Sequence, residues 1–294
     1  MTRIITFGGG KGGTGKSLLA TNVATYLSKK GYSVLVIDAD VESPVTHILL
    51  QIDRIKKEEI VGFVPKINEE KCVGCGICIN KCPENALIGR KGEKPILLEN
   101  LCEGCGLCRL VCPVNAIESK RKKLGEIYEG KRNNISLIQG EVFPGVRQHV
   151  NVTLGALKYA KKKLAGFDFV VIDSAPGTGA NIWLTINISD LVVAVTEPTP
   201  LGANDLRKYI ELVAKYKKPI IIALNKANIP GGSKEQIYNI ASTNNLDVVE
   251  IVYDRAIIEA YINAKQIIEV APDSKAALGI KRLGERILER IAYK

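Results

Sequence analysis

The 294-residue sequence predicts an α/β fold, with a mostly parallel sheet and helices on both faces, into which a small α+β domain is inserted. Two observations lead to this fold class. Apolar runs of strand length alternate with helix-length segments near both ends of the chain, and this alternation implies parallel strands joined by right-handed crossovers. Between these stretches, all eight cysteines fall within Cys72–Cys112. We therefore expect a discontinuous α/β domain, residues 1–61 and 121–294, and an inserted domain, residues 62–120.

Composition is that of an ordinary globular protein. A hydrophobic fraction of 46% and a charged fraction of 24% are sufficient for a core, and no long low-complexity run indicates disorder. No apolar run approaches the roughly 20 residues that a membrane span requires, and the N-terminal residues lack the apolar segment of a signal peptide. We therefore expect a cytoplasmic protein without a membrane partner.

The first forty residues predict the start of the α/β domain. Arg3–Phe7 is a short β-rich run, and a helix is predicted over 16–30 because its apolar residues recur with helical spacing. Gly31 occupies a typical position for a helix to end. Val34–Ile37 is a continuous apolar run that ends at Asp38, as expected of a strand covered on both faces.

Strands and helices alternate again after the cysteine-rich segment. The predicted strands are Phe169–Asp173, Leu191–Thr196, Pro219–Asn225 and Val248–Val252. The predicted helices are Asn151–Leu164, Gly202–Tyr216, Ser233–Asn244 and Asp273–Tyr293. The last helix is amphipathic with basic neighbours, so it either packs on the sheet or binds a membrane surface. We expect it to pack on the sheet.

A glycine-rich motif follows the first strand and opens the first helix. Residues 8–17 satisfy the pattern G-x-x-x-x-G-K-[ST]. In such a loop the backbone N–H groups point at phosphate oxygens, the lysine contacts the β- and γ-phosphates, and the final hydroxyl binds Mg²⁺. A glycine-rich turn without a ligand is the alternative. The predicted nucleotide ligands in this loop are Gly10, Lys11, Gly12, Gly13, Thr14, Gly15, Lys16 and Ser17.

Two of the predicted strands end in carboxylates. Val34–Ile37 runs into Asp38-Ala39-Asp40, and the apolar strand from Phe169 ends in Asp173, which is the Walker B arrangement. The carboxyl ends of parallel strands form the edge where such sheets bind ligands, so these carboxylates should lie beside the phosphate loop. A turn-capping aspartate is the alternative for Asp173.

Lys11 makes the loop more specific. The string K-G-G-T-G-K-S places a second lysine five residues before Lys16. It resembles the deviant Walker A motif of the MinD/ParA/Mrp superfamily of P-loop ATPases, the SIMIBI class. The resemblance covers Met1–Ser43 and the chain from about Leu137 onward. It implies a P-loop NTPase sheet, Mg-dependent hydrolysis of ATP to ADP and phosphate, and a homodimer that forms on ATP binding.

The same resemblance implies roles for single residues. Lys11 would reach across the nucleotide-sandwiched dimer to the partner's phosphates, as an arginine finger does. Asp40 would position or activate the attacking water. Lys11, Lys16 and Asp40 are therefore the predicted catalytic residues.

The resemblance also implies a Mg²⁺ site and a base contact. The residues implied around Mg²⁺ are Ser17, Asp38, Asp40 and Asp173. Residues 174–179 look like the second switch segment of the family. Asn225, which follows a predicted strand, would contact the adenine base, and an asparagine that merely forms a turn is the alternative.

The cysteines form an internal repeat. Cys72–Leu87 and Cys102–Ile117 are identical at nine of sixteen positions with an offset of thirty residues. Eight cysteines in a long chain without an export signal favour metal binding over disulfides. The repeat indicates that one structural unit is used twice.

Each repeat reads C-x2-C-x2-C-x3-C-P and so resembles the bacterial ferredoxin run, in which the fourth cysteine ligates the other cluster. The resemblance implies an inserted ferredoxin domain with two [4Fe–4S] clusters. One would be held by Cys72, Cys75, Cys78 and Cys112, and the other by Cys102, Cys105, Cys108 and Cys82. Zinc, which also binds sets of four cysteines, is the alternative.

The positive charge does not require a nucleic-acid partner. The formal net charge of +10 falls to about +6 when two ferredoxin-type clusters with their thiolates are included. The basic runs at 120–123 and 161–163 are interpreted as solvated faces rather than docking patches. We expect a redox or client protein as the partner.

The leading functional hypothesis is an ATPase in which a nucleotide-dependent dimer switch controls electron transfer, or partner docking, by the two clusters. An ATPase that carries or assembles iron–sulfur clusters is the first alternative. A MinD-like or ParA-like positioning ATPase that senses redox state is the second. The sequence leaves the electron donor, the acceptor and the client open.

Overall fold

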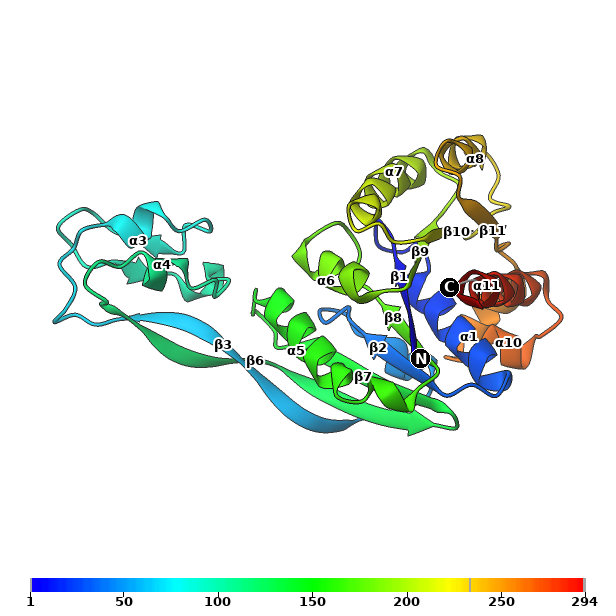
Figure 1. The fold of residues 1–294 in the computed structure, drawn as a ribbon, viewed down its shortest axis with the longest axis horizontal. Coiled ribbons are helices and arrows are strands. Elements are labelled where there is room, and N and C mark those ends of the chain that lie inside the picture. Colours follow the sequence, from blue (N-terminus) through cyan, green and yellow to red (C-terminus); the bar gives the residue numbers. More distant parts are fainter. Residues whose placement is uncertain (1, 233, 293–294) are drawn as a thin grey trace.

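The computed structural model describes residues 2–232 and 234–292 as one nine-stranded sheet covered by helices, with a small module held away from it (Figure 1). The strands are β1 (Arg3–Gly8), β2 (Val34–Asp38), β3 (Ile55–Ile67), β4 (Leu87–Ile88), β5 (Ile96–Leu97), β6 (Ile117–Arg132), β7 (Ile135–Val142), β8 (Phe169–Asp173), β9 (Leu191–Thr196), β10 (Ile220–Leu224) and β11 (Asp247–Glu250). Met1, Ser233, Tyr293 and Lys294 lie outside the described residues, so the predicted helix ends at Ser233 and Tyr293 are not tested.

Helices join most of these strands. They are α1 (Lys16–Lys29), α2 (Thr46–Leu49), α3 (Ile77–Asn80), α4 (Leu107–Leu110), α5 (His149–Lys161), α6 (Ala180–Ile188), α7 (Pro200–Lys215), α8 (Lys234–Thr243), α9 (Arg255–Ile262), α10 (Ile267–Val270) and α11 (Lys275–Ala292). Short 3-10 turns cover Glu99–Leu101 and Leu164–Gly166. None of the described helices is both long and apolar enough to cross a membrane.

The large sheet has the order β11-β10-β9-β1-β8-β2-β7-β6-β3. All pairings from β11 to β7 are parallel, whereas β6 and β3 add to the edge in antiparallel fashion. The predicted α/β fold class with a mostly parallel sheet is therefore confirmed. The predicted strands Phe169–Asp173 and Leu191–Thr196 have the observed bounds.

Side chains of the central strands alternate between two cores, as the pleat of a strand requires. In β9, Leu191 and Val193 pack with α1, α10 and α11, while Val192 and Ala194 pack with α6, α7 and α8. The C-terminal helix α11 buries Leu283 and Ile287 in the first of these cores. Its apolar face is thus used in packing, as expected.

A long two-stranded ribbon was not predicted. β3 and β6 pair from Ile55 opposite Glu129 to Ile67 opposite Ile117, but β6 pairs with β7 only over Gly125–Arg132. Beyond that point the ribbon leaves the sheet and carries the cysteine-rich module at its far end (Figure 1). The predicted domain boundaries at 61/62 and 120/121 fall inside this ribbon.

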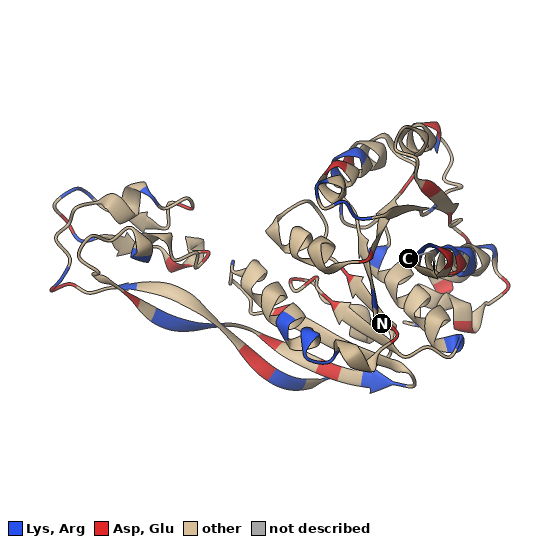
Figure 2. Ribbon diagram, viewed as in Figure 1, with Lys and Arg blue, Asp and Glu red and all other residues tan. Residues whose placement is uncertain are grey.

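Basic and acidic residues follow one another in short runs along the ribbon (Figure 2). Lys123 pairs with Glu59 across the two strands at 2.9 Å, and Lys122 pairs with Glu99 at 2.8 Å. Lys162, from the second basic run, lies 3.7 Å from Glu58. Both basic runs therefore contribute to pairs within the chain, which agrees with their interpretation as solvated faces.

Candidate nucleotide site and cysteine cavities

The phosphate loop connects the end of β1 to the start of α1. Gly15 caps the helix with a φ of 95°, and a Cβ at this position would lie 2.3 Å from the Asn225 amide nitrogen. Asn225, directly after β10, donates from Nδ2 to the carbonyl oxygen of Thr14 at 2.8 Å. A glycine is required at 15 for both reasons, and the observed role of Asn225 is to hold the loop.

Lys16 is the buried cation of this loop. Its side chain is enclosed, and Nζ donates to the carbonyl oxygen of Lys11 at 3.1 Å. Burial lowers the pKa of Lys16, while the negative charges of Asp173 and Asp40 act in the opposite direction. A phosphate would supply the anionic partner that a desolvated ammonium group lacks.

Asp173 lies at the end of β8, opposite Asp38 in the neighbouring strand β2. It is buried, and within the described residues neither of its carboxylate oxygens has a hydrogen-bond donor. Burial and the adjacent charge of Asp38 raise the pKa of Asp173 well above its ordinary value. An orphaned buried carboxylate beside Ser17 and Lys16 fits a divalent cation, which would satisfy its oxygens and neutralise its charge.

Asp38 is held differently. Its carboxylate accepts hydrogen bonds from the Thr46 backbone at 3.1 Å and the Thr46 hydroxyl at 2.8 Å, and from the Asp40 backbone at 3.2 Å. Burial raises the pKa of Asp38 to about 7 in spite of these bonds. In this structure Asp38 fixes the segment from Asp40 to Thr46, and its implied contact with Mg²⁺ stays a prediction.

Lys11 has a partner that sequence reasoning missed. Its ammonium group lies 2.5 Å from Glu197, which follows β9, and Lys226 lies 3.1 Å from the other oxygen of the same carboxylate. Burial opposes ionisation of Glu197, but the two lysines lower its pKa below the ordinary value. A carboxylate one residue beyond a predicted parallel strand was the available signal, the same signal that identified Asp173.

Five of the eight predicted loop residues line one open pocket of about 470 Å³ with Asp40 and Asn225, whereas Gly10, Lys11 and Thr14 do not line it. The pocket brings Gly12, Gly13, Gly15, Lys16, Ser17, Asp40 and Asn225 together. The lining also includes four residues that were not predicted, in α9 and just before it: Tyr253, Ile257, Ile258 and Tyr261. The pocket has a polar phosphate end and an apolar end that suits a planar base.

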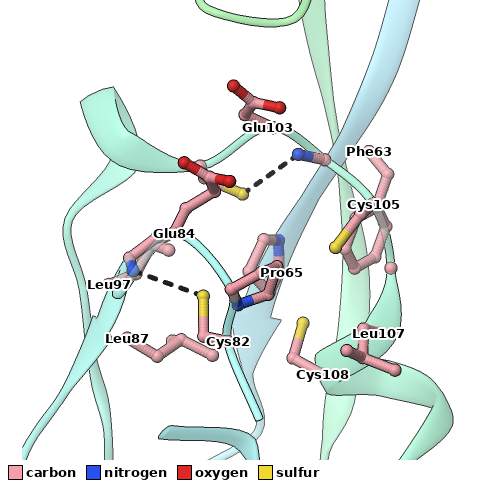
Figure 3. Close-up of a pocket in the computed structure, with 15 residues that line it drawn as sticks. Phe63, Pro65, Cys82, Glu84, Leu87, Leu97, Glu103, Cys105, Leu107 and Cys108 are labelled. Atoms are coloured by element: carbon pink, nitrogen blue, oxygen red, sulfur yellow. Dashed lines mark hydrogen bonds between the residues drawn. The ribbon is translucent and has the colours of Figure 1, made fainter. Parts of the chain in front are cut away.

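The cysteines surround two small cavities. The inner cavity, nearer the large sheet along the ribbon, is lined by Cys82, Cys102, Cys105 and Cys108 (Figure 3). The outer cavity is lined by Cys72, Cys75, Cys78 and Cys112. The fold thus brings together the two sets of four that the ferredoxin resemblance implies, with the last cysteine of each repeat exchanged.

Backbone groups contact several of the sulfurs. Ala86 N donates to Cys82 Sγ at 3.3 Å and Ala116 N to Cys112 Sγ at 3.2 Å. No group of three Cys, His, Asp or Glu side chains within residues 2–232 and 234–292 is arranged around a single metal ion. Four cysteines around a cavity, with donors aimed at sulfur, fit a cluster larger than one ion.

The geometry agrees with the comparison to known proteins. The profile of the CobQ/CobB/MinD/ParA nucleotide binding domain matches residues 5–267. The chain belongs to this family. A family relative, the uncharacterized protein MJ0579 of Methanocaldococcus jannaschii, is 34% identical over 267 residues that cover 90% of this chain and 91% of the relative.

Two further similarities concern proteins with named functions. The structure of the septum site-determining protein MinD of Pyrococcus horikoshii, solved with Mg-ADP, is similar to this chain with a TM-score of 0.60 at 19% sequence identity. The similarity covers 98% of this chain and 96% of the MinD chain. An iron-sulfur cluster carrier protein of the same organism is 24% identical over 231 residues, 72% of this chain and 57% of that protein. The first establishes the fold of this CobQ/CobB/MinD/ParA family member.

Proposed function

We propose that this chain is a Mg-dependent ATPase whose nucleotide-driven homodimerisation controls electron transfer, or partner docking, by two [4Fe–4S] clusters in the inserted module. The clusters would supply one-electron redox chemistry when bound. The protein supplies a nucleotide pocket at one end of the molecule and two four-cysteine cavities at the other. The proposal therefore depends on a physical connection between these sites.

The observation that carries the proposal is such a connection. It begins at Asp40 in the nucleotide pocket, whose neighbour Val41 accepts a hydrogen bond from Val142 N at 2.9 Å. The next residue, Glu42, lies 3.2 Å from Nδ1 of His149, the first residue of α5. The segment that follows β2 is therefore hydrogen-bonded to the end of β7 through Val41, and Glu42 places it against the start of α5.

Gln148, the residue before His149, continues the connection to the inner cavity. Its side chain is buried and does not cap α5. It donates instead to the carbonyl oxygen of Phe63 at 3.1 Å. A Cβ on Gly104 would lie 2.4 Å from Gln148 Oε1, so the loop between Cys102 and Cys105 rests on this side chain. Phe63 and Gly104 both line the inner cavity.

This arrangement gives nucleotide a means of acting on the module. A γ-phosphate that repositions the Asp40 segment would move the start of α5, and Gln148 would transmit the movement to the Cys102–Cys105 loop. The effect requires that ATP bind the two positions with different affinity. Coupling between the sites would then be reciprocal.

We test this by anaerobic, EPR-monitored redox titration with and without a non-hydrolysable MgATP analogue. We expect the analogue to change the equilibrium constant for reduction of the inner cluster about tenfold, or about 59 mV for a one-electron couple. Gln148→Ala should abolish most of this change, because it removes the contact with Gly104. Lys158→Ala, at an exposed position of α5, is the matched control and should leave it intact. No change in the unmodified protein would contradict nucleotide control of the cluster potential.

Lys11→Ala tests the dimer switch. We expect nucleotide binding to stay within about threefold and ATP hydrolysis to fall at least ~100-fold, since a charge supplied in trans acts mainly in the transition state. Analytical ultracentrifugation with the ATP analogue should show loss of the dimer. Lys208→Ala, which removes an exposed lysine of α7, is the control for charge. Unchanged hydrolysis in Lys11→Ala would remove the cross-dimer role.

The similarity to an iron-sulfur cluster carrier protein supports a second candidate function, cluster delivery to a client. All eight cysteines line the two cavities, and ligation by four internal cysteines favours retention over release. Transfer of iron and sulfide to an apo-ferredoxin at a rate that ATP changes would establish this function instead. Absence of transfer would leave the gated redox function.

A further inference from the structure

The two cysteine cavities differ in charge, although the sequence repeat builds both. The inner cavity is lined by two acidic side chains, Glu84 and Glu103, whose carboxylates lie at the same end of it (Figure 3). In the repeat, thirty residues away, their counterparts are Val114 and Val73. Both of these valines line the outer cavity. The acidic pair is therefore placed in one copy of the unit only.

Neither glutamate is neutralised by a neighbour. Other acidic residues of the module form ion pairs, such as Glu99 with Lys122 at 2.8 Å and Glu69 with Lys94 at 3.2 Å. Over residues 2–232 and 234–292, no ion pair within 4.0 Å involves Glu84 or Glu103. Two uncompensated negative charges thus flank the inner cavity, while the non-cysteine lining of the outer cavity is uncharged.

Reduction adds one electron to a cluster that is already anionic with its thiolates. A nearby carboxylate repels this added charge and so disfavours the reduced state. The inner cavity also has one more backbone hydrogen bond to sulfur, from Gly104 N to Cys102 Sγ at 3.4 Å, which favours reduction. This N–H group is only a dipole at a long distance, so we expect its effect on the reduction potential to be smaller than that of two full negative charges.

We propose that Glu84 and Glu103 make the two clusters of this chain unequal, so that the inner cluster has the lower reduction potential. This inference rests on the proposed presence of two clusters and extends it by giving electron transfer a direction. An electron that a one-electron donor protein delivers to the inner cluster, the one nearer the large sheet along the ribbon, moves downhill to the outer cluster. The outer cluster is then the site from which an acceptor is reduced.

The test exchanges the residues of the two repeat copies. Glu84→Val with Glu103→Val gives the inner cavity the side chains of the outer one, and Val73→Glu with Val114→Glu does the reverse. Anaerobic EPR-monitored titration of the unmodified protein should resolve two one-electron couples. In the first double variant, the reduction potential of the lower-potential couple should rise by about 59 mV, which is a tenfold change in the equilibrium constant for reduction. In the reciprocal variant, the reduction potential of the higher-potential couple should fall.

Two further measurements separate a charge effect from damage to the module. Glu84→Gln with Glu103→Gln keeps the size of both side chains, so it should reproduce the rise with unchanged iron and sulfide content. The rise should also shrink at high ionic strength, because both carboxylates are at least partly exposed.

Other results would overturn the inference. If the glutamate variants retain their iron but leave the lower couple unchanged, or move the upper couple, the assignment of these residues is wrong. This failure is distinct from failure of the proposed function, in which the unmodified protein itself would contain no cluster with a [4Fe–4S] EPR signal.

Discussion

Lys16→Ala is expected to weaken MgATP binding about 100-fold or more and to abolish hydrolysis. Lys16 is buried between the loop carbonyl of Lys11 and the carboxylates of Asp173 and Asp40, so its ammonium group is already positioned and desolvated. A 100-fold loss corresponds to about 2.7 kcal/mol, in the range of a desolvated charge-assisted hydrogen bond. Isothermal titration calorimetry and phosphate release measure the two effects.

The matched control for this variant is Lys208→Ala, which removes the same charge from an exposed position of α7. It should bind MgATP normally. Circular dichroism establishes that Lys16→Ala is folded. Hydrolysis by a folded Lys16→Ala protein within threefold of the unmodified rate would show that nucleotide does not use this loop.

Substitutions of paired cysteines are expected to divide the clusters between the two cavities. In Cys82→Ser with Cys105→Ser, both changes affect the inner cavity, so the outer cluster and about half of the iron should remain. In Cys82→Ser with Cys75→Ser, each cavity loses one ligand, so nearly all of the iron should be lost. Iron and sulfide analysis of anaerobically purified protein measures both.

The pair of variants distinguishes crossed from uncrossed ligation. If each repeat instead held its own cluster, the first double variant would lose nearly all of its iron and the second would keep half. Zinc in place of iron in the anaerobically reconstituted protein would contradict both arrangements.

The sequence predicted the parallel core well because its strands are covered on both faces. The continuous apolar run 169–172 is typical of a strand covered on both faces, and the carboxylate of Asp173 lies at its end. The phosphate loop was predictable for a similar reason. Gly15 is needed locally, because its φ of 95° lies in the left-handed region that favours glycine.

The ribbon was not predictable by the same reasoning. β3 has an exposed, charged first half, IKKEE, which lacks the apolar run of a buried strand. Its stability comes from cross-strand partners such as Glu59 with Lys123, and β6 supplies them from a distant part of the sequence. No local pattern contains this information.

Two functional contacts were missed because they join distant segments. Glu197 could be seen at the end of a strand, but its attachment to Lys11 depends on how β9 packs beside β1. The contact of Gln148 with Gly104 depends on how far the ribbon bends back toward α5. Both require the tertiary structure.

The ribbon also determines the order in which the chain can be assembled. The module departs after Ile67 and returns at Ile117, which are directly opposite each other, so it occupies the position of the turn in a β-hairpin. Over Gly125–Arg132 the pairing with β7 sets the register of β6, and β3 continues this register along the ribbon without any cysteine taking part. Under the proposed function, we therefore expect this part of the chain to fold without iron, so that cluster insertion would be a maturation step on a folded nucleotide-binding domain. With the two proposed clusters, a cell short of iron would then accumulate a folded nucleotide-binding protein that lacks only these electron carriers.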